Sequence, residues 1–96
     1  MILHIVLFRW KLEVTEEQIQ DVMEKFKNLK SEIPEIRELY CGENFSKWAK
    51  GNTHAVVVMT QNRVDLEAYR NHPLHLPIAK MIEELEEDSL GFDFET

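Results

Sequence analysis

Two segments of the chain are apolar on both of their alternating faces, and this pattern constrains the fold more than any other feature. In residues 2–10 and 53–61 most positions are aliphatic or aromatic, which predicts strands. A strand that is apolar on both faces needs a cover on each of them. In a domain of only 96 residues, helices usually cover one face of a sheet, so the other face needs a second partner.

Helical patterns separate the predicted strands. Residues 15–18 have the form of a capping box, and the helix that follows should stop before Pro34 and bury the stripe Ile19, Val22, Met23, Phe26 and Leu29. Asn62 is expected to cap a short helix. Pro73 is expected to end that helix and to serve as the first residue of the next one, whose stripe is Leu74, Ile78, Met81, Ile82 and Leu85.

Two further strands complete the expected fold. Residues 35–45 form the predicted second strand, and residues 90–95 alternate apolar and polar side chains in the last one. The acidic run from Glu83 to Asp88 is expected to end the preceding helix as a solvated face. The order β-α-β-β-α-β predicts a single domain over residues 1–96 with an α+β ferredoxin-like fold, in which helices cover one face of a four-stranded antiparallel sheet.

The face of the sheet without helices predicts a second copy as a partner. It would carry the side chains that alternate with the helix-facing ones, namely Leu3, Ile5, Leu7, Ala55, Val57 and Met59. A contiguous apolar patch on a protein in water normally marks an interface. Two sheets packed face to face about a two-fold axis would bury the patch, so we expect a homodimer in the form of a dimeric α+β barrel.

Charge and composition argue against nucleic acid and membranes as partners. The formal charge of −7 argues against nucleic acid, whose phosphates call for a stripe of Lys and Arg. No apolar run approaches the roughly 20 residues that span a bilayer, so a membrane partner is not expected. The first residues lack the basic region of a signal peptide, which predicts a cytoplasmic protein. Cys41 is the single cysteine, and its apolar strand predicts an unreactive thiol.

Residues 65–75 bring one tyrosine and two of the four histidines together. A neutral histidine accepts a proton near pH 7 and a tyrosine hydroxyl polarises a carbonyl, so Tyr69 and His75 are candidates for acid–base catalysis. The alternative is that both side chains are structural. A metal site at His72 and His75 is not expected, because Pro73 disrupts the helical spacing and no other ligand type lies nearby. His72 is better suited to cap the helix that follows.

The other two histidines lie on the faces of the predicted strands that turn toward the helices. Because antiparallel neighbours run in opposite directions, His4 and His54 are expected near opposite ends of the sheet. They would line the two ends of an elongated pocket, or else be core residues with satisfied hydrogen bonds. This separation argues against one metal site made of all four histidines.

Six short segments in a fixed order carry a family resemblance: His4–Phe8, Cys41–Asn44, Thr53–His54, Asp65–Tyr69, His72–His75 and Phe92–Phe94. Over nearly its full length the chain resembles the stress-responsive A/B barrel family. The resemblance implies a ferredoxin-like monomer and a two-fold dimer with a barrel between its sheets. Plant members are associated with stress, and one branch contains a polyketide cyclase that acts without a cofactor.

The same resemblance implies roles for particular residues. In the cyclase branch, a tyrosine and a histidine that match Tyr69 and His75 carry the chemistry, and histidines that match His4 and His54 line the site. It therefore implies Tyr69 and His75 as catalytic residues, no cofactor, no metal, and substrate contacts from His4, His54, Phe26 and Val56. Phe26 stands where the cyclase has a tyrosine, so a polyketide substrate is not implied.

Three hypotheses for the function follow. The first is a cytoplasmic homodimer with a small-molecule pocket between sheet and helices, which, if it is an enzyme, performs cofactor-free proton chemistry on a carbonyl compound as a cyclase, lyase or isomerase. The second is a non-catalytic stress-responsive or ligand-binding protein. The third is a cofactor-independent oxygenase or isomerase of the wider dimeric barrel group. The sequence leaves open whether any reaction is catalysed.

Overall fold

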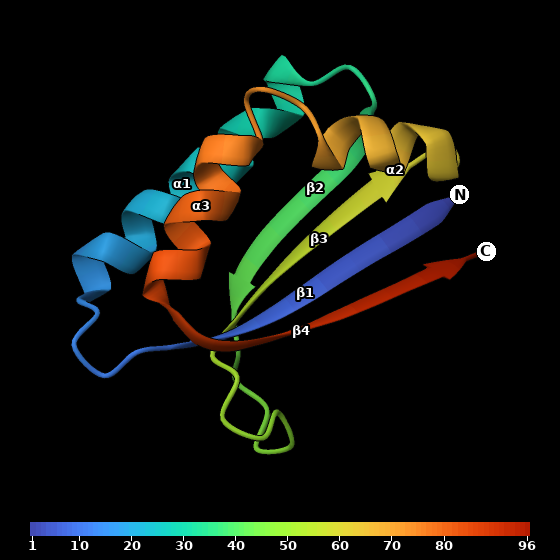
Figure 1. Ribbon diagram of the computed structural model, residues 1–96. Coiled ribbons are helices and arrows are strands. Elements are labelled where there is room, and N and C mark those ends of the chain that lie inside the picture. The colour runs from blue at the N-terminus through green and yellow to red at the C-terminus, as the bar shows by residue number, and fades with distance from the viewer.

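Four strands and three helices make up the computed structural model, which describes residues 1–96 (Figure 1). In chain order they are β1 (Ile2–Trp10), α1 (Glu16–Glu32), β2 (Ile36–Glu43), β3 (His54–Thr60), α2 (Arg63–Arg70), α3 (Leu76–Leu85) and β4 (Glu86–Glu95). The strands form one antiparallel sheet in the order β2-β3-β1-β4. All three helices lie on one side of it and leave the other face bare (Figure 1). The predicted α+β ferredoxin-like arrangement is confirmed.

Helix α1 begins at the predicted capping box. The Thr15 hydroxyl accepts from the Gln18 amide at 3.1 Å, and the Gln18 side chain accepts from the Thr15 amide at 2.9 Å. The helix ends at Glu32, ahead of Pro34, and every member of its predicted stripe is buried in the core. None of the three helices has the length and apolar character needed to cross a membrane.

The break between α2 and α3 differs from the prediction in its position. Pro73 does not begin α3; the helix starts at Leu76, and Pro77 lies in its first turn. Between the helices, the His72 Nδ1 accepts from the Leu74 amide at 3.1 Å, and the His75 amide donates to the His72 carbonyl at 2.9 Å. These two bonds close a turn that holds His75 immediately before α3. The local turn therefore outweighs the preference of proline for a first helical position.

Two strand boundaries also differ from the prediction. The acidic run does not all belong to the helix, because α3 ends at Leu85 and the backbone of Glu86 is already extended. Pairing with β1 decides this boundary, and such long-range pairing leaves no mark in a helical period. The second strand is shorter than residues 35–45, since β2 ends at Glu43 and Phe45 is fully exposed in the loop that follows.

The bare face of the sheet is apolar, as predicted, and wider than predicted. The register places Leu3, Ile5 and Leu7 opposite Met59, Val57 and Ala55 of β3. On their other side, the same three residues lie opposite Phe94, Phe92 and Leu90 of β4. Phe92 is 62% exposed and Leu90 is 57% exposed. The strand β4 therefore extends the apolar face to the edge of the sheet.

Candidate functional site

A cavity of about 200 Å³ lies between the sheet and the helices. Its floor comes from β1 and β3, and its other walls come from α1, α2, α3 and the start of β4. The lining residues are His4, Val6, Phe8, Phe26, Val56, Tyr69, Arg70, His75, Ala79, Ile82, Glu86 and Ser89. Five of the six residues that the sequence singled out thus meet in one cavity; His54 is the exception.

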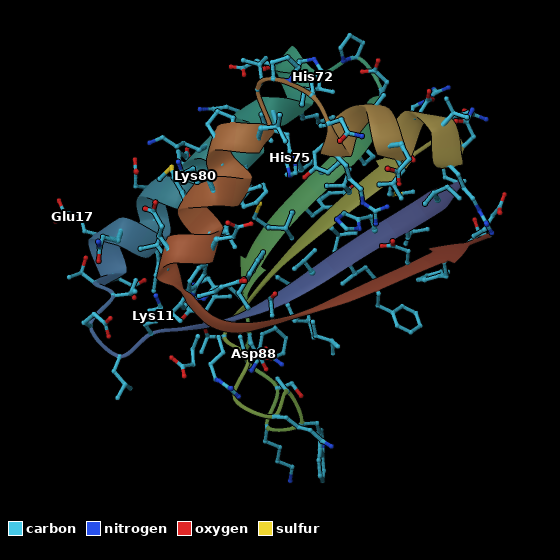
Figure 2. All side chains as sticks on the ribbon, in the orientation of Figure 1. Lys11, Glu17, His72, His75, Lys80 and Asp88 are labelled. Carbon is cyan, nitrogen blue, oxygen red and sulfur yellow. The ribbon has the colours of Figure 1, made fainter.

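Tyr69 and His75 lie side by side in this cavity. Their ring centroids are 4.4 Å apart, with an angle of 43° between the ring planes. Tyr69 comes from the last turn of α2, and His75 comes from the turn before α3. Figure 2 shows His75 beneath the loop that joins these helices, on the side of the sheet, whereas His72 lies at the outer end of the loop.

A hydrogen bond fixes which nitrogen of His75 is basic. The His75 Nδ1 lies 2.9 Å from the Arg70 carbonyl oxygen. A carbonyl oxygen only accepts, so Nδ1 must carry the proton and donate it. In the neutral ring, Nε2 therefore keeps its lone pair. The remaining nitrogen of His75 is the one that can take a proton from a bound molecule.

Burial shifts the pKa values of His75 and Tyr69 in the directions that acid–base catalysis requires. Burial lowers the pKa of His75 below its ordinary value of 6.5, although the bond to the Arg70 carbonyl acts in the opposite direction. His75 is therefore neutral at pH 7 and available as a base. Burial also raises the pKa of Tyr69 well above its ordinary value of 10, so its hydroxyl keeps its proton. A protonated hydroxyl can donate a hydrogen bond to a carbonyl oxygen.

His4 belongs to a charged network that the sequence did not reveal. Its Nδ1 donates to Asp93 Oδ1 at 2.5 Å, and the other oxygen of Asp93 accepts from Arg70 at 2.5 Å. Arg70 also donates to Glu67 at 2.6 Å. Burial disfavours the Asp93 carboxylate, but the bonds from His4 and Arg70 outweigh it and lower the pKa of Asp93 below its ordinary value of 3.8.

This network orients His4 toward the cavity. Because the Nδ1–H of His4 donates to the Asp93 carboxylate, Nε2 is the ring nitrogen that keeps a lone pair when His4 is neutral. The His4 ring also meets Tyr69 edge to face, with 6.1 Å between the ring centroids. The alternation of residues 90–95 already placed Asp93 opposite the apolar side chains of its strand. Only the register of β4 against β1 shows that its neighbour is His4.

His54 lies outside the cavity, toward the other end of the sheet. The register places it opposite Phe8 on β1, four residues from His4, as the antiparallel pairing predicted. The indole N–H of Trp10 donates to the His54 Nδ1 at 3.0 Å. Indole nitrogen is only a donor, so the basic nitrogen of His54 is already occupied. His54 therefore serves the packing of β1 and β3 in this structure.

His72, Cys41 and a second hollow are weaker candidates for a functional site than Tyr69 and His75. The His72 Nδ1 is used by the Leu74 amide in the turn between the helices. Burial raises the pKa of the Cys41 thiol to about 11, so little thiolate exists at neutral pH. A larger, polar hollow of about 330 Å³ lies between α2 and the end of β4, but its two arginines are paired with carboxylates.

The residues 2–96 match the stress responsive A/B barrel domain. Olivetolic acid cyclase from Cannabis sativa is 28% identical over 93 residues, which cover 95% of this chain and 92% of the cyclase. The hydroxynitrile lyase from Passiflora edulis has a TM-score of 0.90 and 25% identity, over 97% of this chain and 90% of the lyase. A dimeric ferredoxin-like protein of unknown function from Thermobifida fusca has a TM-score of 0.88 and 29% identity, over 99% of this chain and 90% of the other.

These similarities extend over nearly the whole chain and agree with the fold and with the order of its elements. The family resemblance seen in the sequence is confirmed. The chain belongs to the stress responsive A/B barrel domain family.

Proposed function

We propose that this protein binds a small carbonyl compound in the cavity and moves a proton on it without a cofactor. One observation carries the proposal: the basic Nε2 of His75 is left free beside the Tyr69 ring in a cavity under the helices. Burial keeps His75 neutral and Tyr69 protonated at pH 7, through the directions in which it shifts each pKa. The pair thus combines a base with a hydrogen-bond donor.

The roles follow from these protonation states. His75 takes a proton from the carbon beside the carbonyl, while the electron pair of that C–H bond moves toward the carbonyl oxygen. Tyr69 donates a hydrogen bond to this oxygen as its negative charge grows. His4, oriented by Asp93, accepts a hydrogen bond from the substrate, and Phe26 and Val56 contact its apolar part. The proton on His75 returns to the product.

Two similar proteins support the class of reaction. One is a cyclase and the other is a lyase. Both match most of the length of this chain, and the lyase also shares its fold. We extend cyclase- or lyase-type chemistry to this chain as part of the proposal. The small cavity favours a substrate of low volume, because ligand pockets for drug-sized molecules are usually about 300 Å³ or larger.

The proposal includes a homodimer that forms through the bare face of the sheet. Its support is the apolar surface on β1, β3 and β4, together with three similar solved structures that are described as dimeric. A face-to-face dimer would remove this surface from water. A cytoplasmic location is also part of the proposal, and the lone free cysteine fits a reducing compartment.

A non-catalytic binding protein is the second candidate, and one observation favours it. Each of the four histidines uses one ring nitrogen in a hydrogen bond within the chain, to Asp93, Trp10, Leu74 or Arg70. Such bonds hold buried histidines in many proteins without any catalytic role. On this hypothesis the cavity takes up a ligand and releases it unchanged.

Proton exchange in D₂O separates the two candidates. A panel of small ketones and β-diketones is incubated with the protein, and the loss of each α-proton signal is followed by NMR. Catalysis predicts exchange by the wild-type protein that is lost in His75→Ala and retained in Lys80→Ala, which changes an exposed side chain of α3 outside the cavity. In the lyase-type reaction, His75 would take the hydroxyl proton of a cyanohydrin as the bond to carbon breaks and cyanide leaves. Mandelonitrile is therefore added, and the release of benzaldehyde is followed by absorbance. Ligand-induced shifts of the His75 ring without any turnover would favour the binding protein and overturn the catalytic proposal.

A further inference from the structure

The inner face of α3 connects the catalytic end of the cavity with a second polar end. His75, Ala79, Ile82 and Glu86 all line the cavity. Their spacing of four, three and four residues is that of one face of a helix. At a rise of about 1.5 Å per residue, the backbones of His75 and Glu86 are about 16 Å apart along this face. Glu86 is thus at the opposite end of the cavity from His75.

A β-bulge turns Glu86 toward the cavity. Along β4, Asp93 pairs with His4 and Ser89 pairs with Phe8, so both lie on the side of the helices. Regular alternation would next place Glu87 on that side. The register shifts between Arg9 and Trp10, however, so that Trp10 pairs with Glu86 and Glu87 becomes the extra residue. Bulges often re-aim a side chain next to a binding site.

The surroundings of Glu86 leave its carboxylate available to a ligand. None of the eight ion pairs of the structure involves Glu86. Phe8, Phe26 and Ile82 give the same cavity apolar lining. An ionised carboxylate only accepts hydrogen bonds, so its natural partner is a donor. Bonds of this kind are stronger than those between neutral groups.

The end of α3 adds to the negative potential at this position. A helix C-terminus carries a partial negative charge, and Glu86 is the capping residue of α3. Lys11 offsets part of this partial charge, because its ammonium donates to the Glu84 carbonyl and its amide to the Leu85 carbonyl, each at 3.0 Å. The Glu86 carboxylate, which no ion pair engages, keeps its own negative charge. At the other end, the charge of Arg70 is matched by Asp93. A carboxylate on the ligand would therefore meet repulsion near Glu86.

We propose that Glu86 selects the substrate: a carbonyl compound whose far end carries a hydrogen-bond donor, with an ammonium bound better than a hydroxyl and a carboxylate rejected. The inference rests on the proposed function for the carbonyl end of the ligand. What the inference adds is the recognition of the other end of the ligand by Glu86. The carbonyl lies beside Tyr69 and His75, and the donor of the tail lies at Glu86.

Matched ketones test this selection. A series of straight-chain methyl ketones of increasing length carries a methyl, hydroxyl, ammonium or carboxylate tail. Dissociation constants come from the ligand-induced NMR shifts of the His75 and Tyr69 rings, which do not depend on turnover. At the length that spans the cavity, the wild-type protein should bind the ammonium tail at least about tenfold more tightly than the methyl tail. The carboxylate tail should bind most weakly.

Two variants of Glu86 and one control complete the test. Glu86→Gln removes the charge and Glu86→Leu removes the acceptor, so both should abolish the preference for an ammonium tail while the affinity for the methyl tail stays within about twofold. Glu87→Gln removes a charge from the bulge residue and should leave all four affinities unchanged. An ammonium preference that survives Glu86→Leu, or a wild-type protein indifferent to the tail, would overturn the inference.

The outcome is independent of the fate of the proposed function. Tail selection through Glu86 without α-proton exchange would retain the inference and remove the catalytic proposal. Exchange of ketones that bind equally well with every tail would do the reverse. The thermal unfolding temperature of each variant shows whether it is folded, and the affinity for the methyl tail shows whether its cavity is intact.

Discussion

The rings of Tyr69 and His75 lie 4.4 Å apart, although a helix end and a turn separate them in the chain. The bond from the His75 Nδ1 to the Arg70 carbonyl links this ring to the last residue of α2. It therefore fixes the ring beside Tyr69 and sets its tautomer at the same time. One short turn thus both orients a base and places a hydrogen-bond donor next to it.

Removal of the His75 ring or of the Tyr69 hydroxyl should lower catalysis without unfolding the protein. His75→Ala should lower the rate of α-proton exchange by about 10² to 10⁴, the usual contribution of a general base. Tyr69→Phe keeps the packing and removes the hydroxyl, so it should lower the rate by about 10² to 10³. Size-exclusion chromatography with light scattering checks that both variants keep the oligomeric state of the wild type. Wild-type rates in both variants would exclude the pair from the mechanism.

The protonation of His75 predicts how stability depends on pH. Its pKa in the folded protein lies below the unfolded value of about 6.5, so the folded state binds protons more weakly. His75 therefore contributes stability above pH 6.5, and this contribution is lost as the pH falls through the folded pKa. Urea unfolding of the wild type should show a decline below pH 6.5 that is smaller in His75→Gln. If the free energy of unfolding depends on pH equally in the wild type and in His75→Gln, the pKa of His75 is not lowered by folding and the prediction is wrong.

The same property is visible directly by NMR. The Hε1 signal of His75 should titrate with a midpoint below 6.5, because burial disfavours the imidazolium form. His75→Ala assigns the signal by its disappearance. A midpoint at or above 6.5 would contradict the neutral, half-buried base on which the proposed function depends.

Asp93 should act through His4. Asp93→Asn replaces a carboxylate that accepts from both His4 and Arg70 with an amide of similar size. We expect His4 to lose its fixed Nδ1–H tautomer, which the ¹⁵N chemical shifts of its ring report. The rate of α-proton exchange in the ketone substrates should also fall. Glu67→Gln breaks the outer pair with Arg70 and should leave the tautomer of His4 unchanged. An unchanged tautomer in Asp93→Asn would show that Asp93 does not orient the ring.

A charge on the bare face of the sheet should dissociate the dimer. Phe92 is 62% exposed and lies opposite Ile5 in the middle of the apolar face. Phe92→Glu would place a charge in the interface, where a buried unpaired charge is strongly unfavourable. Light scattering should then report a monomer at micromolar concentration. Val64→Glu, at a 77% exposed position of α2, is the control and should remain a dimer.

Local patterns in the sequence were sufficient to predict the elements. The Thr15 capping box, the helical stripe of α1 and the alternation of β1 and β3 act over a few residues, so they predict structure without knowledge of contacts. Apolar side chains on both faces of β1 also predicted the bare face. The boundaries at Pro73 and Glu86 were wrong, since a turn and a strand pairing decided them.

The sequence by itself determined the order of the elements and the residue types that meet in the cavity, because periodicity and capping are local properties. Only the tertiary structure decided which of these residues meet. The register of β4 brings Asp93 to His4, and the bulge beside Trp10 brings Glu86 into the cavity in place of Glu87. The contact with Trp10 occupies the His54 Nδ1 and leaves His54 outside the cavity, although the sequence had predicted it as a substrate-binding residue. These contacts join residues far apart in the chain, and no local pattern records them.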